Sequence, residues 1–140
     1  MATDVERIMK DYYAAYNSHD VDGIASLWTD DGFYESVASG AVTRSKEELV
    51  ASFRASFVAF TDQKFELKSV FSAGDWVASE WVWTGTHAGD WHGLPATGKS
   101  SSIRGASIME LRNGKISRSS DYWNLAALLQ QLGLIPGAPS

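Results

Sequence analysis

The hydrophobic positions of the first sixty residues recur at the spacing of α-helices. One stripe covers residues 5–16 and contains three tyrosines, and a second covers residues 49–60 and contains three phenylalanines. Spacings of i, i+3, i+4 and i+7 place such side chains on one face of a helix. A serine or threonine followed three residues later by glutamate, as at Thr3 and Ser45, is typical of a helix start. The pattern predicts two half-buried helices, with a short helix capped by Asp20 between them.

From residue 64 onward the hydrophobic period changes to two, which is typical of strands. A strand beginning there is followed by predicted strands over residues 76–87, 100–111 and 116–123. The Asn-Gly dipeptide before the last of them is a strong signal for a hairpin turn. An irregular loop is expected over residues 88–98. Helices followed by an antiparallel meander make an α+β pattern.

The pattern predicts one domain over residues 1–134, with residues 135–140 as a C-terminal tail. A short strand is expected over residues 33–37, after a turn at residues 29–32, and a closing helix ends at Gly133. One face of a twisted sheet has to be covered by the striped helices. We therefore expect a cone-shaped, curved antiparallel sheet wrapped around the N-terminal helices, with a pocket between helix and sheet.

The composition narrows the class of protein. The 140 residues are 44% hydrophobic and carry a net charge of -5, which is typical of one globular domain. No basic run offers a surface for phosphates and no apolar run is long enough to span a membrane, so neither nucleic acid nor a membrane is an expected partner. No signal pattern precedes the first helix, and a cytoplasmic location is expected.

The side-chain inventory favours an aromatic pocket without metal or cofactor. The chain has no cysteine, which excludes a thiolate nucleophile and a cysteine-based zinc site. Its three histidines lack the spacing of a metal site, and it contains no nucleotide-binding fingerprint. Six Trp, five Tyr and six Phe in so short a chain indicate a cavity with aromatic walls.

Several stretches resemble the SnoaL-like polyketide cyclases of the nuclear-transport-factor-2-like superfamily. The resemblance covers nearly the whole chain and rests on residues 16–20, 27–31, 85–98, 113–116, 121–124 and 130–134. It implies a homodimer assembled through the sheet. It also implies a cofactor-free cyclase or isomerase that acts by acid/base catalysis on an apolar, carbonyl-bearing, polyketide-like small molecule, as in antibiotic biosynthesis. The same scaffold also hosts noncatalytic modules that bind small molecules, and this is the alternative function.

Asp121 is the leading catalytic candidate, because the resemblance places the acid/base of the cavity near the end of the last strand. A carboxylate among aromatic rings is desolvated, so its pKa rises toward the working pH. Such a group can remove a proton α to a carbonyl and return it. The alternative is an exposed aspartate that caps the closing helix. Asn124 stands where relatives often have a second aspartate, which argues against a mechanism with two carboxylates at this place.

Histidines and tryptophans are expected around this carboxylate. His87 ends the long strand and could orient a substrate carbonyl or tie the following loop, which contains His92, to the sheet. Trp81 and Trp83 are two residues apart and point to the same face, as pocket wall or as core. They replace the Arg-x-Asp pair of the limonene-epoxide-hydrolase-like relatives, so epoxide hydrolysis is disfavoured. Tyr16 is a candidate oxyanion donor.

The expected site therefore has two kinds of residue. Asp121 and His87 are the expected catalytic residues. The expected substrate-binding residues share an aromatic or imidazole ring and are Tyr16, Trp28, Phe53, Phe57, Trp81, Trp83, Trp91, His92 and Trp123. The outer face of the sheet, which the helices leave bare, is the expected homodimer contact.

Overall fold

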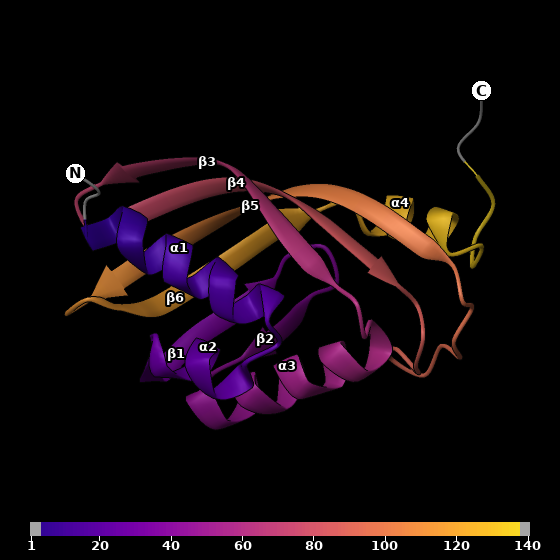
Figure 1. Cartoon of the computed structure of the whole chain (residues 1–140), viewed down its shortest axis with the longest axis horizontal. Helices are drawn as coiled ribbons and strands as arrows, with labels where there is room; N and C mark the ends of the chain where they lie inside the picture. The colour runs from indigo at the N-terminus through magenta and orange to yellow at the C-terminus, as the bar shows by residue number, and fades with distance from the viewer. Residues whose placement is uncertain (1–3, 138–140) are drawn as a thin grey trace.

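In a computed structural model, which describes residues 4–137, helices cover one face of a curved, open sheet of six strands (Figure 1). The strand order is β2-β1-β6-β5-β4-β3. The predicted α+β class is confirmed. The elements in chain order are α1 (Asp4–Asn17), α2 (Val21–Ser26), β1 (Trp28–Ser36), β2 (Ala41–Thr43), α3 (Lys46–Ala59), β3 (Lys64–Ala73), β4 (Trp76–Thr86), β5 (Ser100–Arg112), β6 (Lys115–Trp123) and α4 (Leu125–Gln131).

The two striped helices lie where their patterns require. α1 packs against β3, α3 packs against β1, and the short α2 joins them on the concave side (Figure 1). The stripe of α1 is buried in the main core, and so are Leu49 and Phe53 of α3. α4 lies at the other end of the sheet and forms a second core cluster with Phe60 and Ile103. The space between α3 and the sheet thus lies between the main core and this second core cluster.

Side chains cap three of the helices. Ser45, Asp20 and Asn124 each accept a hydrogen bond from the backbone N–H three residues further on, which satisfies one otherwise unpaired donor. The predicted cap at Thr3 lies outside the described residues. Because Asn124 caps α4, the side chain of Asp121 is not the helix cap that was its alternative interpretation.

The first strand pairs with the last, and the two run parallel. This pairing places Tyr34 beside Ser119 and Ser36 beside Asp121. The prediction of a turn at residues 29–32 is wrong, because β1 already begins at Trp28 and continues through a shift of register. Such an irregularity breaks the period-two signal that identifies a strand in the sequence.

The alternation predicted along β3 holds only in its first half. Phe65 and Leu67 pack against the core, but the register with β4 shifts around Lys68. Beyond this bulge Val70 packs against the core, and Phe71 is 63% exposed on the outer side. The period-two alternation predicted from residue 64 therefore does not hold through the whole strand, because one extra residue reverses the faces that follow it.

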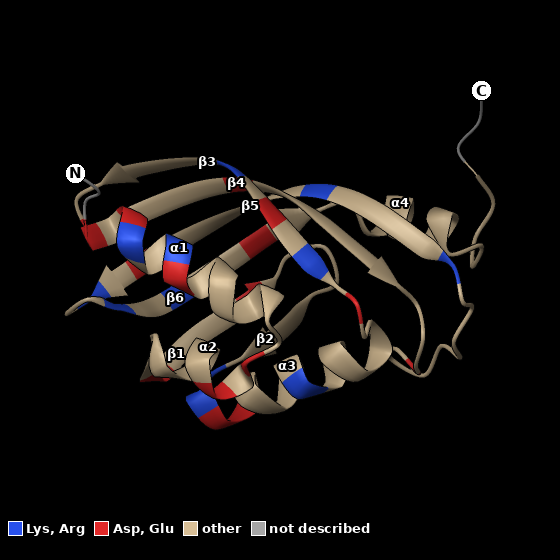
Figure 2. Cartoon of the chain, viewed as in Figure 1, with Lys and Arg blue, Asp and Glu red and all other residues tan. Residues whose placement is uncertain are grey.

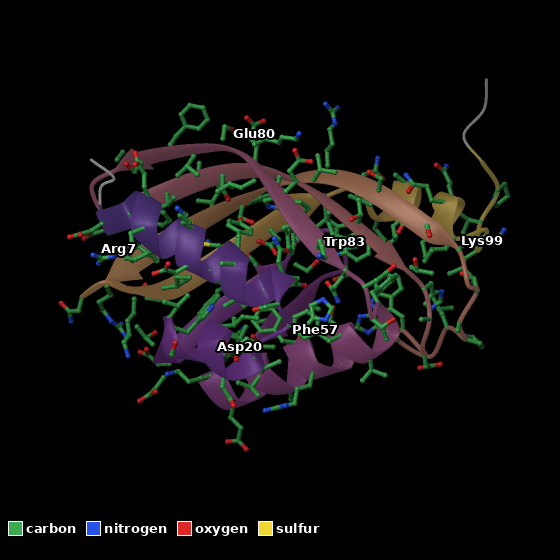
Figure 3. The ribbon with its side chains drawn as sticks, viewed as in Figure 1. Arg7, Asp20, Phe57, Glu80, Trp83 and Lys99 are labelled. Carbon is green, nitrogen blue, oxygen red and sulfur yellow. The ribbon has the colours of Figure 1, made fainter. Side chains whose placement is uncertain are left out.

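Side chains on the central strands alternate between the two faces of the sheet. On β4, Glu80 points outward and Trp83 lies between the sheet and α3, on the side from which Phe57 approaches (Figure 3). Acidic and basic residues are interspersed along the outer surfaces, and α4 carries none (Figure 2). Within residues 4–137 no helix is long and apolar enough to cross a membrane.

Candidate active site

A cavity of about 290 Å³ lies between the concave face of the sheet and α3. Phenylalanine, tyrosine and tryptophan supply nine of its 21 lining residues, and eight others have polar or charged side chains. Eight of the eleven residues expected from the sequence line it, and they are Tyr16, Phe53, Trp81, Trp83, Trp91, His92, Asp121 and Trp123. The alternation along β4 and β6 thus turns Trp81, Trp83, Asp121 and Trp123 toward the helices.

The carboxylate of Asp121, on β6, receives hydrogen bonds on both oxygens. Ser107 donates to Oδ1 at 2.6 Å and Ser119 at 3.4 Å, and Tyr34 donates to Oδ2 at 2.8 Å. Desolvation by the surrounding protein raises the pKa of Asp121, and the hydroxyl donors, which favour the charged form, offset only part of this effect. The exposed part of the side chain meets the cavity. The carboxyl group is therefore oriented and able to exchange a proton there.

A tryptophan supports this arrangement from the neighbouring strand. Trp81 is 4% exposed, and its Nε1 donates a hydrogen bond of 2.9 Å to Ser107 Oγ. The indole lies over Gly105, where a Cβ atom would collide with the ring. Ser107, held from one side by Trp81, donates its own hydrogen to Asp121. The glycine and the serine therefore explain how a large indole and a carboxylate fit side by side.

A second polar cluster is centred on Gln63, which is fully buried between α3 and β3. Its Oε1 accepts hydrogen bonds from the Tyr16 hydroxyl at 2.6 Å and from Trp83 Nε1 at 2.9 Å. Its Nε2 donates to the carbonyl oxygen and to Oγ of Ser56. Burial also raises the pKa of Tyr16, which keeps the phenol protonated. Because the hydroxyl hydrogen of Tyr16 is engaged by Gln63, the geometry does not support the oxyanion role expected of Tyr16.

His87 lies behind the cavity wall. It is fully buried, its ring stacks on Phe60 with centroids 5.4 Å apart, and its Nδ1 is 3.2 Å from Thr97 Oγ1. Phe60 stands between His87 and the cavity, because Phe60 lines the wall and His87 does not. The geometry therefore favours the alternative interpretation, in which the histidine ties the loop to the sheet, over contact with a ligand.

Two aromatic residues expected at the site also lie elsewhere. Trp28 is fully buried in the main core at the start of β1. Phe57 stacks on His19 with ring centroids 4.5 Å apart and packs edge-on against Tyr16. Neither residue lines the cavity. Helical spacing predicted that both side chains face inward, although Trp28 lies on β1 and not on the short helix. Inward positions include the core as well as the pocket.

The loop after β4 forms one side of the cavity. The backbone N–H groups of Ala88 and Gly89 both donate to the carbonyl oxygen of Ala59, which fixes the loop to the end of α3. Further along, Trp91 packs edge-on against Phe60, with centroids 5.8 Å apart, and lines the cavity together with the exposed Asp90. The loop therefore brings polar and aromatic groups to the cavity wall.

Sequence reasoning did not single out four polar residues of the site. Tyr34 and Ser36 lie two apart on the short strand predicted at residues 33–37, so period two was a usable signal for their common face. Ser107 lies opposite Asp121 in the antiparallel pair of β5 and β6. Gln63 gave no signal, because a glutamine between two elements is most often exposed.

Comparison with known proteins places the chain in a family. Residues 6–132 match the SnoaL-like polyketide cyclases. The solved structure of AclR from Streptomyces galilaeus, a candidate hydroxylase, is 28% identical, with 99% of this chain and 87% of that chain covered and a TM-score of 0.83. A candidate polyketide cyclase from a Silicibacter species is 27% identical, with 89% and 92% covered and a TM-score of 0.78.

The fold is also that of a more distant relative. A protein from Catenulispora acidiphila with a ketosteroid isomerase-like fold, solved with trimethylamine, has a TM-score of 0.81 at 22% identity, with 94% of this chain and 97% of that chain covered. A comparison with curated proteins returns no match. Since the family match spans nearly all of the 140 residues, the chain belongs to the SnoaL-like polyketide cyclase family.

Proposed function

We propose that the protein is a cofactor-free enzyme of the cyclase or isomerase type, which moves a proton next to a carbonyl group of an apolar, polyketide-like molecule. The observation that carries this proposal is Asp121, a carboxyl group with a raised pKa inside an aromatic cavity. A general acid/base works best when its pKa lies near the operating pH, because it must both accept and return a proton.

The reaction begins when the carboxylate of Asp121 accepts a proton from the carbon next to a substrate carbonyl. The electron pair of the broken C–H bond forms a C=C bond, and the carbonyl π pair moves onto oxygen. In an isomerase the proton returns to another carbon. In a cyclase the enolate carbon attacks a second carbonyl carbon of the same molecule, and the proton goes to the resulting alkoxide. Tyr34 and Ser107 keep the carboxylate oriented throughout.

The cavity walls suit a compact, ring-containing substrate. Small-molecule pockets usually measure about 300–1,000 Å³, and this cavity lies at the lower end with about 290 Å³. Trp83, Phe53 and Trp123 offer flat apolar surfaces against which a flexible chain can fold. Ring closure gains from such folding, because it holds the two reacting carbons close together.

The second candidate function is a noncatalytic module that binds a small apolar molecule. The Gln63 cluster favours it. The Tyr16 hydroxyl and Trp83 Nε1 both donate to Gln63 Oε1, so neither group is available to a ligand. In that case Asp121 is a polar residue of the cavity wall and transfers no proton to or from the ligand. The two functions differ in whether the carboxyl group exchanges protons with a bound ketone.

The test follows the exchange of α-hydrogens of β-tetralone, a compact aromatic ketone, for deuterium by NMR in D2O. We expect the wild-type protein to accelerate the exchange, and we expect Asp121→Asn to lower the rate constant by about 10²–10⁴-fold with little change in affinity. Asp90→Asn is the matched control, since Asp90 also lines the cavity but is exposed. Equal exchange in wild type and Asp121→Asn would favour the binding module.

A further inference from the structure

An enolate needs a hydrogen-bond donor for its oxygen, and several donors around the cavity are already engaged. In the described part of the chain, the N–H or O–H groups of six lining residues bond to protein acceptors. These residues are Tyr16, Tyr34, Gln63, Trp81, Trp83 and Trp123. A donor that has to turn away from such a partner provides little preorganised stabilisation.

Ser36 differs from these residues. Its Oγ accepts a hydrogen bond of 2.9 Å from Trp123 Nε1, so its own hydrogen points away from the indole. Among residues 4–137 the structure shows no acceptor bonded to that hydrogen. The side chain lines the cavity and is 8% exposed. The hydroxyl group is thus oriented by one partner and available to another.

The position of Ser36 relative to Asp121 suits a donor acting beside a base. The two residues are register partners in the parallel pair of β1 and β6, and both side chains reach the cavity. Neighbouring strands lie about 4.8 Å apart. Side chains at this spacing can contact two adjacent groups of one ligand, namely the α-carbon and the carbonyl oxygen next to it.

We propose that Ser36 is a further catalytic residue, whose hydroxyl group donates a hydrogen bond to the substrate's carbonyl oxygen while Asp121 takes the α-proton. The proton that moves is the one from carbon, and it goes to Asp121; Ser36 keeps its own hydrogen and stabilises the negative charge on oxygen. The substrate is then a ketone that binds with its carbonyl oxygen toward Ser36 on β1 and its α-hydrogen toward Asp121 on β6. This proposal rests on the proposed function for its chemical step.

Other serines of the wall are poorer donors. Ser39 and Ser52 are exposed, so water competes for their hydroxyl groups. Ser56 belongs to the Gln63 cluster, where its carbonyl oxygen and its Oγ both accept from Gln63 Nε2. Ser36 therefore combines burial, orientation by Trp123 and a place beside the base.

The first test measures binding by calorimetry with two ligands of one skeleton, β-tetralone and the hydrocarbon tetralin. We expect Ser36→Ala to lower the affinity for β-tetralone by about 2- to 10-fold and to leave that for tetralin unchanged. Ser36→Thr should retain the preference for the ketone. Ser72→Ala, at an exposed serine of β3 that does not line the cavity, should bind both ligands as the wild type does.

A second variant distinguishes a Ser36 that donates to the ligand from a Ser36 that only holds Trp123 in place. Ser36→Ala also removes the acceptor of Trp123 Nε1, and Trp123→Phe removes the same protein hydrogen bond but keeps the Ser36 hydroxyl. If Trp123→Phe reduces the ketone preference as much as Ser36→Ala does, the role of Ser36 is structural and the proposal is wrong. A wild-type protein with no preference for the ketone overturns it as well.

The second test measures deuterium exchange of β-tetralone. Loss of one oxyanion donor typically costs about 10²–10³-fold in rate, and we expect a loss of this size in Ser36→Ala with recovery in Ser36→Thr. An active wild type with undiminished exchange in Ser36→Ala contradicts the proposal. If the wild type catalyses no exchange, the proposed function fails, and the binding experiment still decides whether Ser36 donates to a carbonyl oxygen.

Discussion

Tyr34 on the first strand donates a hydrogen bond of 2.8 Å to Oδ2 of Asp121 on the last strand. Burial, and then the nearby charge of Asp121, raise the pKa of Tyr34 well above its usual value. The phenol therefore keeps its proton and acts as a donor to the carboxylate. The contact orients the carboxyl group and also favours its charged form, so Tyr34 limits how far burial raises the pKa of Asp121.

Replacing this tyrosine tests that balance. In Tyr34→Phe the carboxylate loses a donor to its charged form, so we expect the pKa of Asp121 to rise further. The acidic limb of the pH–rate profile for β-tetralone exchange should shift to higher pH, because a group with a higher pKa forms its carboxylate at a higher pH. Tyr13→Phe is the control, since Tyr13 bonds to Ser79 and does not line the cavity. A profile that does not move would contradict the role of Tyr34 as a positioning residue.

The raised pKa of Asp121 also predicts how stability depends on pH. The folded protein binds more protons than the unfolded chain between the ordinary aspartate pKa of 3.8 and the higher folded value. The contribution of this group to the free energy of unfolding therefore falls as pH rises through that interval. We expect the stability of Asp121→Asn relative to wild type to increase as the pH rises above the ordinary aspartate pKa of 3.8, measured by urea unfolding. A constant difference would show that burial does not shift this group.

The Gln63 cluster predicts a loss of stability. Gln63→Met keeps the length of the side chain but leaves the Tyr16 hydroxyl and Trp83 Nε1 without their acceptor. Each unpaired buried group costs about 1–3 kcal/mol, so we expect the two groups together to lower the free energy of unfolding by about 2–6 kcal/mol. Gln131→Met is the control, because that exposed amide bonds only to the backbone of Ser102. Similar losses in both variants would argue against the cluster.

The two tryptophans of β4 should respond differently to truncation. Trp81→Ala should lower the free energy of unfolding by about 3–5 kcal/mol, because Trp81 is 4% exposed and packs over Gly105. Trp83 is half-buried and lines the cavity, so Trp83→Ala should weaken the binding of tetralin. Trp81→Phe keeps an aromatic ring at its position and should weaken that binding less. Calorimetry with tetralin and thermal unfolding of each variant measure the two effects. Unchanged binding in Trp83→Ala would remove Trp83 from the ligand site.

We propose that the outer face of the sheet joins two copies of the chain. Phe71, Trp76, Ile108 and Tyr122 expose between 36% and 63% of their surface on that side. Symmetric dimers bury such self-complementary faces. Light scattering at micromolar concentration should give the mass of a dimer for wild type and of a monomer for Ile108→Arg. Val58→Arg, at an exposed apolar position on α3, should remain dimeric. A monomeric wild type would contradict the proposal.

Local patterns were sufficient for most of the fold. The stripes of α1 and α3 have one apolar face each, and the hairpin at Asn113 and Gly114 has the positive φ angles that its sequence predicts. The errors lie where a strand is irregular. A shifted register at the start of β1 and the bulge near Lys68 in β3 both depend on the neighbouring strand, which the sequence of one strand does not reveal.

The site was only partly predictable for a related reason. Alternation places Trp81, Trp83 and Asp121 on the inner face, and all three line the cavity. Alternation does not distinguish a residue that lines the cavity from one buried behind the lining. For this reason it did not show that His87 lies outside the cavity. Gln63 was missed because its burial results from partners on α1, α3 and β4 that come together only in the folded chain.

The parallel pairing of β1 with β6 has a consequence for folding kinetics. β6 joins the β1–β2 hairpin to the rest of the sheet, so this contact closes a loop that contains most of the chain. Contacts between such distant segments form slowly, because loop closure costs entropy before the contact stabilises the fold. A nascent chain that still lacks β6 holds Tyr34 and Ser36 without the carboxylate that they flank. Asp121, the proposed base, therefore reaches the cavity only when the strand that completes the sheet is in place.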